Sequence, residues 1–171
     1  MHKKLRPHTA PKAMTRFGIG PPLAAFSILY CLVMYAATRH FAPLFSMNAL
    51  PPMIRTILGT AFISAGIAFF ITALKALTQA YNCGILKKDG VFAACRHPIY
   101  SAWIVFIVPG MAFLTNSWLG LTAPIAMYGL FKVLIKKEEN YLQEKFGAEF
   151  ARYKKNVPEL LPAGWLKKNN E

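Results

Sequence analysis

Three long stretches without a charged side chain limit what this chain can fold into: residues 17–38, 56–74 and 98–131. A bilayer core of about 30 Å is crossed by about 20 apolar residues in a helix. The first two stretches therefore fit one crossing each, whereas the third, at about 1.5 Å per residue, is long enough for two. Asn116-Ser117 lies near its middle and is the expected turn. Because backbone polar groups in hydrocarbon must bond to one another, helices are favoured over open strands.

The sequence thus predicts an all-α integral-membrane protein whose four transmembrane helices lie at about residues 21–37, 54–77, 98–114 and 119–145. With 171 residues, the chain is long enough for one membrane domain, residues 17–171, behind a basic tail, residues 1–16. The fourth helix is expected to run on beyond the membrane, since its apolar residues keep a helical spacing past the first lysines. A face of small residues predicts close packing of the second helix: Gly59, Ala61, Ser64, Ala65, Gly66 and Ala68.

The formal net charge of +13 is explained by membrane topology. Basic residues gather on the cytoplasmic side of membrane proteins. If the N-terminal tail is cytoplasmic, all 20 Lys and Arg residues except Arg39 and Arg55 lie on that side of the four-helix arrangement. We therefore predict that both termini are cytoplasmic, that the basic tail contacts anionic membrane lipids, and that nucleic acid is not a partner. A bacterial inner membrane and an endoplasmic reticulum both fit this pattern.

The three cysteines, Cys31, Cys83 and Cys95, are odd in number and form no Cys-x-x-Cys pair. Such a set predicts neither a disulfide framework nor a zinc site. On a cytoplasmic face, Cys83 and Cys95 are expected to be free thiols. No metal is predicted for this chain.

Two elements are expected to meet on the inner face: the loop that ends in Arg96-His97, and the extension of the fourth helix with Glu138-Glu139. The hairpin of the third and fourth helices brings them together, and ionisable groups at the edge of a membrane favour a functional site. Each residue also has a plainer interpretation. His97 is able to cap a helix, Arg96 to bind headgroup phosphates, and Tyr100 to lie in the interface, while the two glutamates resemble a solvated charged run.

The residues around this site form a two-part motif. Gly-x-Phe-x-x-x-Arg-His-Pro-x-Tyr spans residues 90–100, and Glu-Glu-x-x-Leu-x-x-x-Phe-Gly-x-x-Phe-x-x-Tyr-x-x-x-Val-Pro spans residues 138–158. The motif closely resembles the isoprenylcysteine carboxyl methyltransferase family and its relatives among phospholipid and thiol methyltransferases. The resemblance implies an integral-membrane methyltransferase that uses S-adenosylmethionine. It also implies a cofactor pocket between the cytoplasmic inner loop and the C-terminal helical extension, and a lipophilic acceptor that enters from the bilayer.

By position in the motif, the resemblance implies that the cofactor is bound by Ile85, Leu86, Lys87, Phe92, His97, Pro98, Ile99, Tyr100 and Glu138. Arg96 and Glu139 are the expected catalytic residues, and the cations Lys132 and Lys136 are expected to bind the substrate. The chemistry agrees, because S-adenosylmethionine offers an ammonium to a carboxylate, a carboxylate to a cation and an adenine to an aromatic face. Methyl transfer needs alignment and desolvation more than an acid or a base.

The chain departs from the carboxyl methyltransferases at two positions of the motif. Leu134 stands where that family has an arginine that helps to hold the acceptor carboxylate, and Glu159 follows Val-Pro where arginine is usual. The acceptor is therefore left open between a carboxylate, an amine and a thiol, and Glu139 or His97 is able to take a proton from either of the latter two. The alternatives to a methyltransferase are a nicotinamide-dependent membrane reductase and a non-catalytic membrane protein of the same fold.

Overall fold

A computed structural model describes residues 18–163 of the chain. In this range the regular secondary structure is helical, apart from one isolated bridge between Ser46 and Ser117. The basic tail predicted at residues 1–16 lies outside the described residues. The predicted all-α class is therefore confirmed for the described part of the chain.

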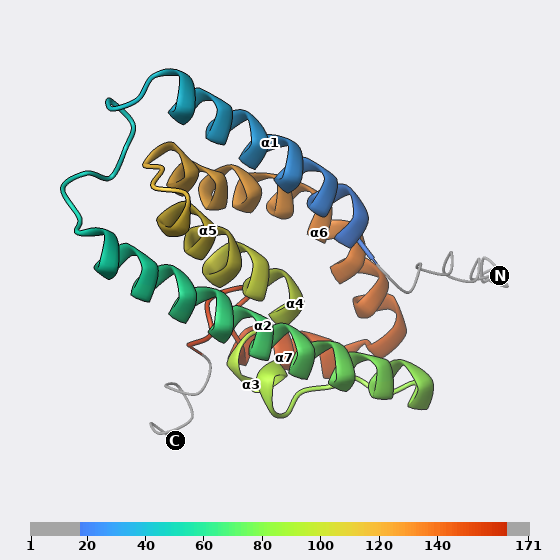
Figure 1. The fold of residues 1–171 in the computed structure, drawn as a ribbon. Coiled ribbons are helices and arrows are strands. Elements are labelled where there is room, and N and C mark those ends of the chain that lie inside the picture. Colours follow the sequence, from blue (N-terminus) through green and yellow to red (C-terminus); the bar gives the residue numbers. More distant parts are fainter. Residues whose placement is uncertain (1–17, 164–171) are drawn as a thin grey trace, which may run out of the picture.

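The helices follow the predicted spans closely (Figure 1). The elements in chain order are α1 (Gly20–His40), α2 (Pro52–Cys83), α3 (Val91–Ala94), α4 (Pro98–Ser101), η1 (Ala102–Ile107), α5 (Val108–Leu114), η2 (Leu119–Thr122), α6 (Ala123–Phe146) and α7 (Ala148–Asn156). The second helix runs further than expected, to Cys83, which shortens the inner loop. Helix α6 runs on beyond Lys132, Lys136 and Lys137 to Phe146, and it is followed by Gly147, where φ is +54°.

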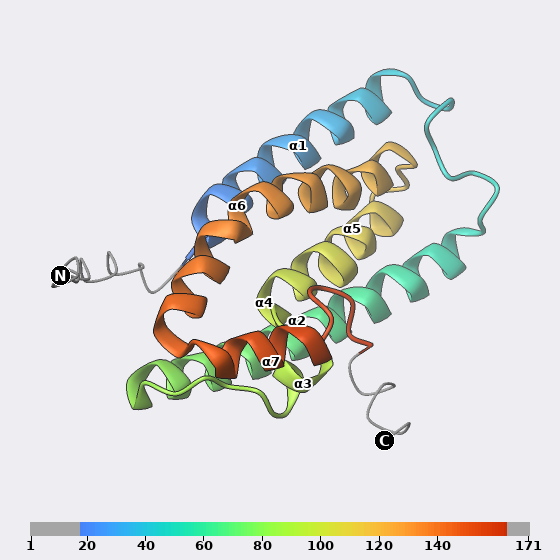
Figure 2. The same ribbon diagram turned by 180° about the vertical axis from the view of Figure 1, so that it is seen from behind.

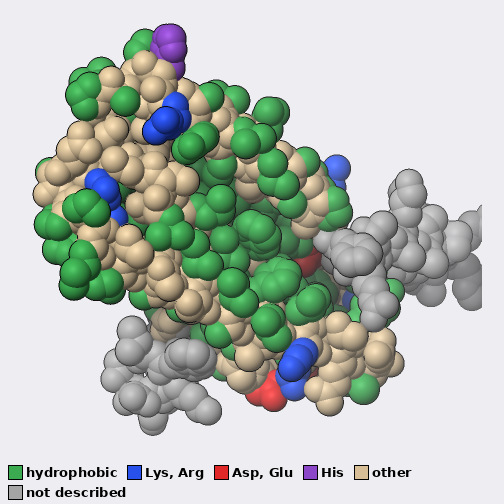
Figure 3. Space-filling view, viewed as in Figure 1, with side chains coloured by type: hydrophobic (Ala, Val, Ile, Leu, Met, Phe, Trp, Pro, Cys, Tyr) green, Lys and Arg blue, Asp and Glu red, His purple; other side chains and the backbone are tan. Residues whose placement is uncertain are grey.

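Three helices are long and apolar enough to cross a membrane: α1, α2 and the continuous stretch Leu119–Phe146. The segment Pro98–Leu114 is an apolar helix of shorter length. Large hydrophobic side chains lie exposed along α1 and α2, for example Leu29 and Ile57. Figure 3 shows many hydrophobic side chains on the surface of this face of the molecule. Such a surface is stable in lipid and costly in water, which indicates a membrane protein.

The hairpin of α4, η1 and α5 with α6 lies between α1 and α2 (Figures 1 and 2). Helix α1 packs on α6, whereas α2 packs on α5 and η1. The core beneath α1 is formed by apolar side chains from α1, α4, η1, α5 and α6, which include Leu23, Ile104, Met127 and Phe131. The first two helices therefore act as the outer walls of the bundle.

Pro109 interrupts the helical hydrogen bonding of the segment Pro98–Leu114. The six residues before Val108 form the π-helical turn η1, in which the Val108 amide donates to the Trp103 carbonyl. Proline lacks an N–H and its ring clashes with the carbonyl one turn earlier. A π-turn widens the backbone there and accommodates the proline without ending the helix.

Helix α2 contacts its neighbours through a narrow line of small residues. Gly59, Gly66, Ala73 and Ala80 are buried and lie seven residues apart. A Cβ at Gly59 would lie 2.9 Å from the Gly110 carbonyl oxygen, so the backbones of α2 and α5 approach closely. The predicted small-residue face was wrong at its other members, since Ala61, Ser64, Ala65 and Ala68 are exposed. Those four lie on the exposed side of the helix.

Candidate functional site

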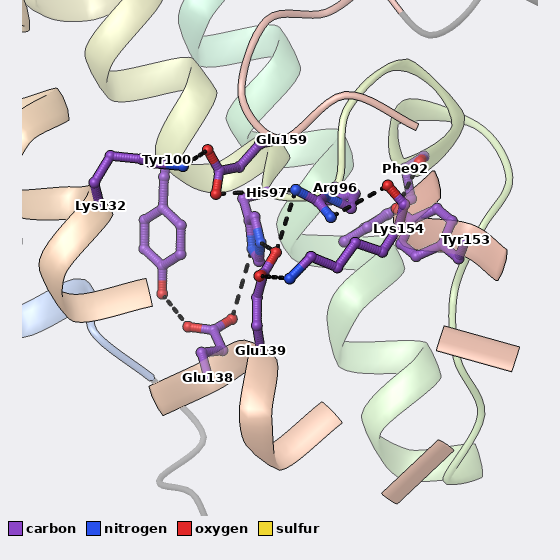
Figure 4. A network of polar contacts seen from close by, with 10 residues as sticks. All are labelled: Phe92, Arg96, His97, Tyr100, Lys132, Glu138, Glu139, Tyr153, Lys154 and Glu159. Atoms are coloured by element: carbon purple, nitrogen blue, oxygen red, sulfur yellow. Dashed lines mark hydrogen bonds and ion pairs between the residues drawn. The ribbon is translucent and has the colours of Figure 1, made fainter. Parts of the chain in front are cut away.

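The predicted polar residues of the two motif halves meet at the end of the bundle where α6 joins α7, which is called the inner end below (Figure 4). His97 lies between the two glutamates of α6: its Nδ1 is 3.9 Å from Glu138 Oε1, and its Nε2 is 3.5 Å from Glu139 Oε1. The Tyr100 hydroxyl donates a hydrogen bond of 3.0 Å to Glu138 Oε2. His97 is buried, with 5% of its surface exposed. The structure thus joins the loop to the helix extension as the hairpin argument expected.

The C-terminal segment after α7 fixes the position of the loop. The Arg96 amide donates to the Pro158 carbonyl at 2.9 Å, and the His97 amide donates to the Glu159 carbonyl at 3.2 Å. Pro98 begins α4 directly afterwards, at a position where its missing N–H costs little. His97 is therefore held on both sides, by backbone pairing before it and by a helix after it. Figure 2 shows the C-terminal segment beside α3 and α4.

Glu138 and Glu139 point in different directions because neighbouring residues on a helix lie about 100° apart. Glu138 faces the cavity described below. Glu139 faces Arg96, whose Nη2 is 3.3 Å from its Oε1, and Lys154, whose Nζ donates to its Oε2 at 2.6 Å. The side chains of Arg96 and Glu139 are 8% and 10% exposed, so this is a buried ion pair that holds α6, α7 and the loop together.

Glu159 extends this ion-pair cluster to the surface. Its Oε1 lies 3.9 Å from Arg96 Nη2, and its Oε2 accepts a hydrogen bond of 2.8 Å from Lys132. Lys132 is therefore occupied by Glu159 and does not line the cavity, and Lys136 is exposed on α6. The structure does not bring the two cations predicted to bind substrate into the cavity with the other predicted residues.

A cavity of about 660 Å³ begins at Glu138 and extends between α1 and the inner half of α2. Figure 3 shows this face of the molecule hollowed and covered with hydrophobic side chains. The wall contains nine of the predicted residues: Ile85, Leu86, Lys87, Phe92, Arg96, His97, Ile99, Tyr100 and Glu138. Pro98 is buried beside the cavity without lining it, and Glu139 lies behind its wall. Most predicted site residues therefore surround one space.

The cavity wall also contains residues for which the sequence analysis proposed no role. From the end of α6 and from α7 they are Tyr141, Leu142, Lys145, Phe146, Phe150 and Tyr153. The first three follow Glu138 at helical spacing, a signal that was present in the sequence. From α1 and α2 the wall includes Leu23, Ala24, Phe70, Leu74 and Leu77. These contacts join segments far apart in the chain, and no local pattern marks them.

Burial and hydrogen bonding hold the loop in a fixed shape. The Tyr153 hydroxyl donates to the Phe92 carbonyl at 2.7 Å, and burial raises the pKa of this phenol.

Burial also raises the pKa of the Cys95 thiol to about 11. A thiol in that environment stays protonated at neutral pH and is a poor nucleophile. Cys31, Cys83 and Cys95 are free thiols, as predicted for the last two.

The cavity wall has a definite distribution of charge. Its one carboxylate among residues 18–163 is Glu138, and its cations are Lys87, Arg96 and Lys145. Lys87 lies 3.1 Å from Asp89, whereas Lys145 lies over the rings of Phe146 and Tyr141. Within the described residues, no group of three His, Cys, Asp or Glu side chains is arranged to hold a metal. The site suits a ligand that carries both charges and an apolar part.

The sequence is similar to a family of known proteins. The model of the isoprenylcysteine carboxyl methyltransferase (ICMT) family matches residues 54–144, more than half of the chain. The protein-S-isoprenylcysteine O-methyltransferase of Mus musculus is 35% identical over 77 residues, which are 45% of this chain and 27% of the mouse protein. The Homo sapiens protein of the same name is 34% identical over 77 residues, again 45% of this chain and 27% of the relative.

A plant relative matches a longer stretch. Protein-S-isoprenylcysteine O-methyltransferase B of Arabidopsis thaliana is 29% identical over 103 residues, which are 60% of this chain and 51% of the plant protein. The chain thus spans between 27% and 51% of the length of these relatives.

Proposed function

Because the chain belongs to the isoprenylcysteine carboxyl methyltransferase family, we propose that it is a membrane enzyme that transfers a methyl group from S-adenosylmethionine to a lipophilic acceptor. One observation carries this proposal: a continuous cavity joins a polar end, at His97, Tyr100 and Glu138, to an apolar arm between α1 and α2. A charged cofactor and a lipid-soluble acceptor need such a combination in order to meet. We propose that residues 17–171 form a single methyltransferase domain.

The residues at the polar end fit S-adenosylmethionine. Glu138 supplies the negative charge that the ammonium group requires, and Phe92 and Tyr141 supply aromatic faces for the adenine. Arg96 supplies a donor for the carboxylate, since its buried Nε has no hydrogen-bond partner among residues 18–163. In this proposal the cofactor also contacts Ile85, Leu86, Lys87, His97, Ile99 and Tyr100, while Pro98 holds His97 in place.

The cofactor supplies an activated methyl group, and the protein contributes alignment and the exclusion of water. The buried pair of Arg96 and Glu139 fixes the wall on which His97 lies. We assign Glu139 this positioning role instead of contact with the acceptor, because its carboxylate lies behind the cavity wall. His97, which faces the cavity, is the group able to take a proton from an amine or thiol acceptor.

The acceptor is proposed to enter the apolar arm from the bilayer. The relatives are named for O-methylation of isoprenylcysteine, so the carboxylate of an S-isoprenylated cysteine is the first acceptor to test. Leu23, Phe70, Leu74 and Trp103 give the arm the apolar lining that an isoprenyl chain requires. Amine and thiol acceptors with the same hydrophobic group are the second and third choices for the same assay.

Calorimetric titration of the purified protein with S-adenosylmethionine and S-adenosylhomocysteine tests the cofactor assignment. We expect both to bind, and we expect Glu138→Ala to weaken binding by about tenfold or more, since a hydrogen bond to a charged group contributes about 1.5–3 kcal/mol. The matched control is Glu144→Ala, which removes an exposed carboxylate from the same helix and should bind normally. Binding of a reduced nicotinamide cofactor in place of both compounds would favour the reductase alternative.

We also propose four membrane crossings with both termini on the cytoplasmic side, in a bacterial inner membrane or an endoplasmic reticulum. The three long helices and the shorter apolar segment Pro98–Leu114 support this count. Cys83, exposed at the inner end of α2, and Ala49→Cys, introduced in the exposed outer connection of a Cys83→Ser variant, are suitable labelling sites. A membrane-impermeant maleimide should label them from opposite sides, and labelling from one side would contradict the topology.

A further inference from the structure

The backbone just before α1 lies against Glu138, the carboxylate that is proposed to bind the cofactor. Gly18 and Gly20 line the cavity together with Glu138 and Tyr100. A Cβ placed on Gly18 would lie 2.7 Å from Glu138 Oε2 and 3.0 Å from the Tyr100 hydroxyl oxygen. The segment lies outside residues 54–144, so the family match does not account for it.

We propose that Gly18 is a positioning residue that lets the backbone before α1 lie against the Tyr100–Glu138 hydrogen bond and hold the Glu138 carboxylate toward the cofactor. This inference rests on the cofactor role proposed for Glu138. Two features of Gly18 carry it: the absence of a side chain, and a φ of +50°, which L-residues rarely adopt. Ile19, the next residue, is buried in the core beside Tyr100 and fixes the segment.

The neighbouring atoms determine how a side chain at Gly18 would act. A contact of 2.7 Å is too short, so either the backbone or the glutamate must move. The carboxylate end of Glu138 is the movable partner, whereas Ile19 is buried. Glu138 should therefore turn away and lose its bond to Tyr100. The damage is expected in ligand affinity more than in the fold.

The first measurement is the affinity of Gly18→Ala for S-adenosylhomocysteine by calorimetry. We expect a loss of about tenfold, as for a lost hydrogen bond to a charged group. Gly147→Ala controls for backbone strain, because Gly147 also has positive φ, at +54°, and an added Cβ there meets nothing within 4 Å. It should lower the thermal midpoint yet keep its affinity within about twofold of the unaltered protein. Normal affinity in Gly18→Ala would overturn the proposal, as would an equal loss in Gly147→Ala.

The second measurement needs no ligand. Gly18→Ala is combined with Glu138→Ala, and the thermal midpoints of the four proteins form a double-mutant cycle. We expect Gly18→Ala to lower the thermal midpoint by about 2–4 °C less when Glu138 is already absent. Neither the short contact with Glu138 Oε2 nor the hydrogen bond from Tyr100 to Glu138 is then present to be lost. Additive changes would overturn the proposal. If the unaltered protein binds no cofactor, the function proposed above fails, while the cycle still decides whether Gly18 acts through Glu138.

Discussion

The two ends of the bundle differ in the kind of polar side chain that they contain. The outer end is the one where the turn between α5 and η2 lies, and the inner end is the one where α6 joins α7. At the outer end, the Thr38 hydroxyl lies 2.6 Å from the Ser117 hydroxyl, and the Tyr30 hydroxyl lies 3.0 Å from that of Thr122. These bonds join α1 to the turn between α5 and α6 with neutral groups that satisfy each other. None of these four residues lines the cavity, and Arg55, a cation at this end, donates to Asn116 Oδ1 and to the Met47 carbonyl.

The inner end contains charges arranged around a cavity. Glu139 lies behind the wall and pairs with both Arg96 and Lys154, whereas Glu138 and the aromatic Tyr100 face the cavity. Both ends join segments that lie far apart in the sequence. A polar cluster at the end of such a bundle therefore indicates a binding site when some of its charged side chains face a cavity.

Breaking the buried ion pair of Arg96 and Glu139 at the inner end should have the largest effect on stability. Arg96→Ala leaves Glu139 buried with Lys154 as its remaining cation, and we expect a loss of about 3 kcal/mol in the free energy of unfolding. Thermal or denaturant unfolding of the purified protein measures it. Arg152→Ala removes an equal charge from an exposed position of α7 and should change stability little. Equal stability of the two variants would show that the inner cluster does not hold the loop.

Removing the outer hydroxyl pair should have an intermediate effect confined to stability. Thr38→Val deletes the bonds to Ser117 and to the Met34 carbonyl, and we expect about 1 kcal/mol of destabilisation with unchanged affinity for S-adenosylhomocysteine. Thr72→Val is the control, because the Thr72 hydroxyl is exposed and bonds only within its own helix. A change of cofactor affinity in Thr38→Val would show that the two ends are coupled.

The outermost ion pair of the inner end should matter least. Lys132→Ala removes the bond to Glu159 from a lysine whose side chain is 48% exposed. Exposed pairs contribute about 0–1 kcal/mol, so unfolding and cofactor binding should both remain close to those of the unaltered protein. A loss as large as that of Arg96→Ala would mean that Glu159 needs Lys132 in order to hold Arg96.

The sequence was sufficient for the helices and for the polar core of the site. Uncharged length predicts a crossing directly, and His97 and Glu138 were placed together because a helical hairpin must return to the side from which it left. The direction of each side chain was harder to predict. Lys132 bonds to Glu159 instead of facing the cavity, and only a structure shows which side of α6 meets the C-terminal segment.

Contacts between distant segments explain the rest of what was missed. Phe70 and Leu74 line the cavity because α2 packs against its neighbours through the line of small residues that includes Gly66. The sequence predicted a broader packing face around that glycine, and this face was partly wrong. Gly18 reaches Glu138 because α1 packs on α6. Neither arrangement has a local pattern, since each depends on where the whole helix settles in the bundle.

The pairing of Arg96 and His97 with Pro158 and Glu159 has a consequence for biosynthesis. A ribosome delivers the chain from its N-terminus, so α1 and α2 are able to enter the membrane long before the C-terminal segment exists. The loop gains its backbone partners only when that late segment has emerged. During translation the loop therefore cannot take its described shape until residues 158 and 159 have been synthesised, about 60 residues after the loop itself.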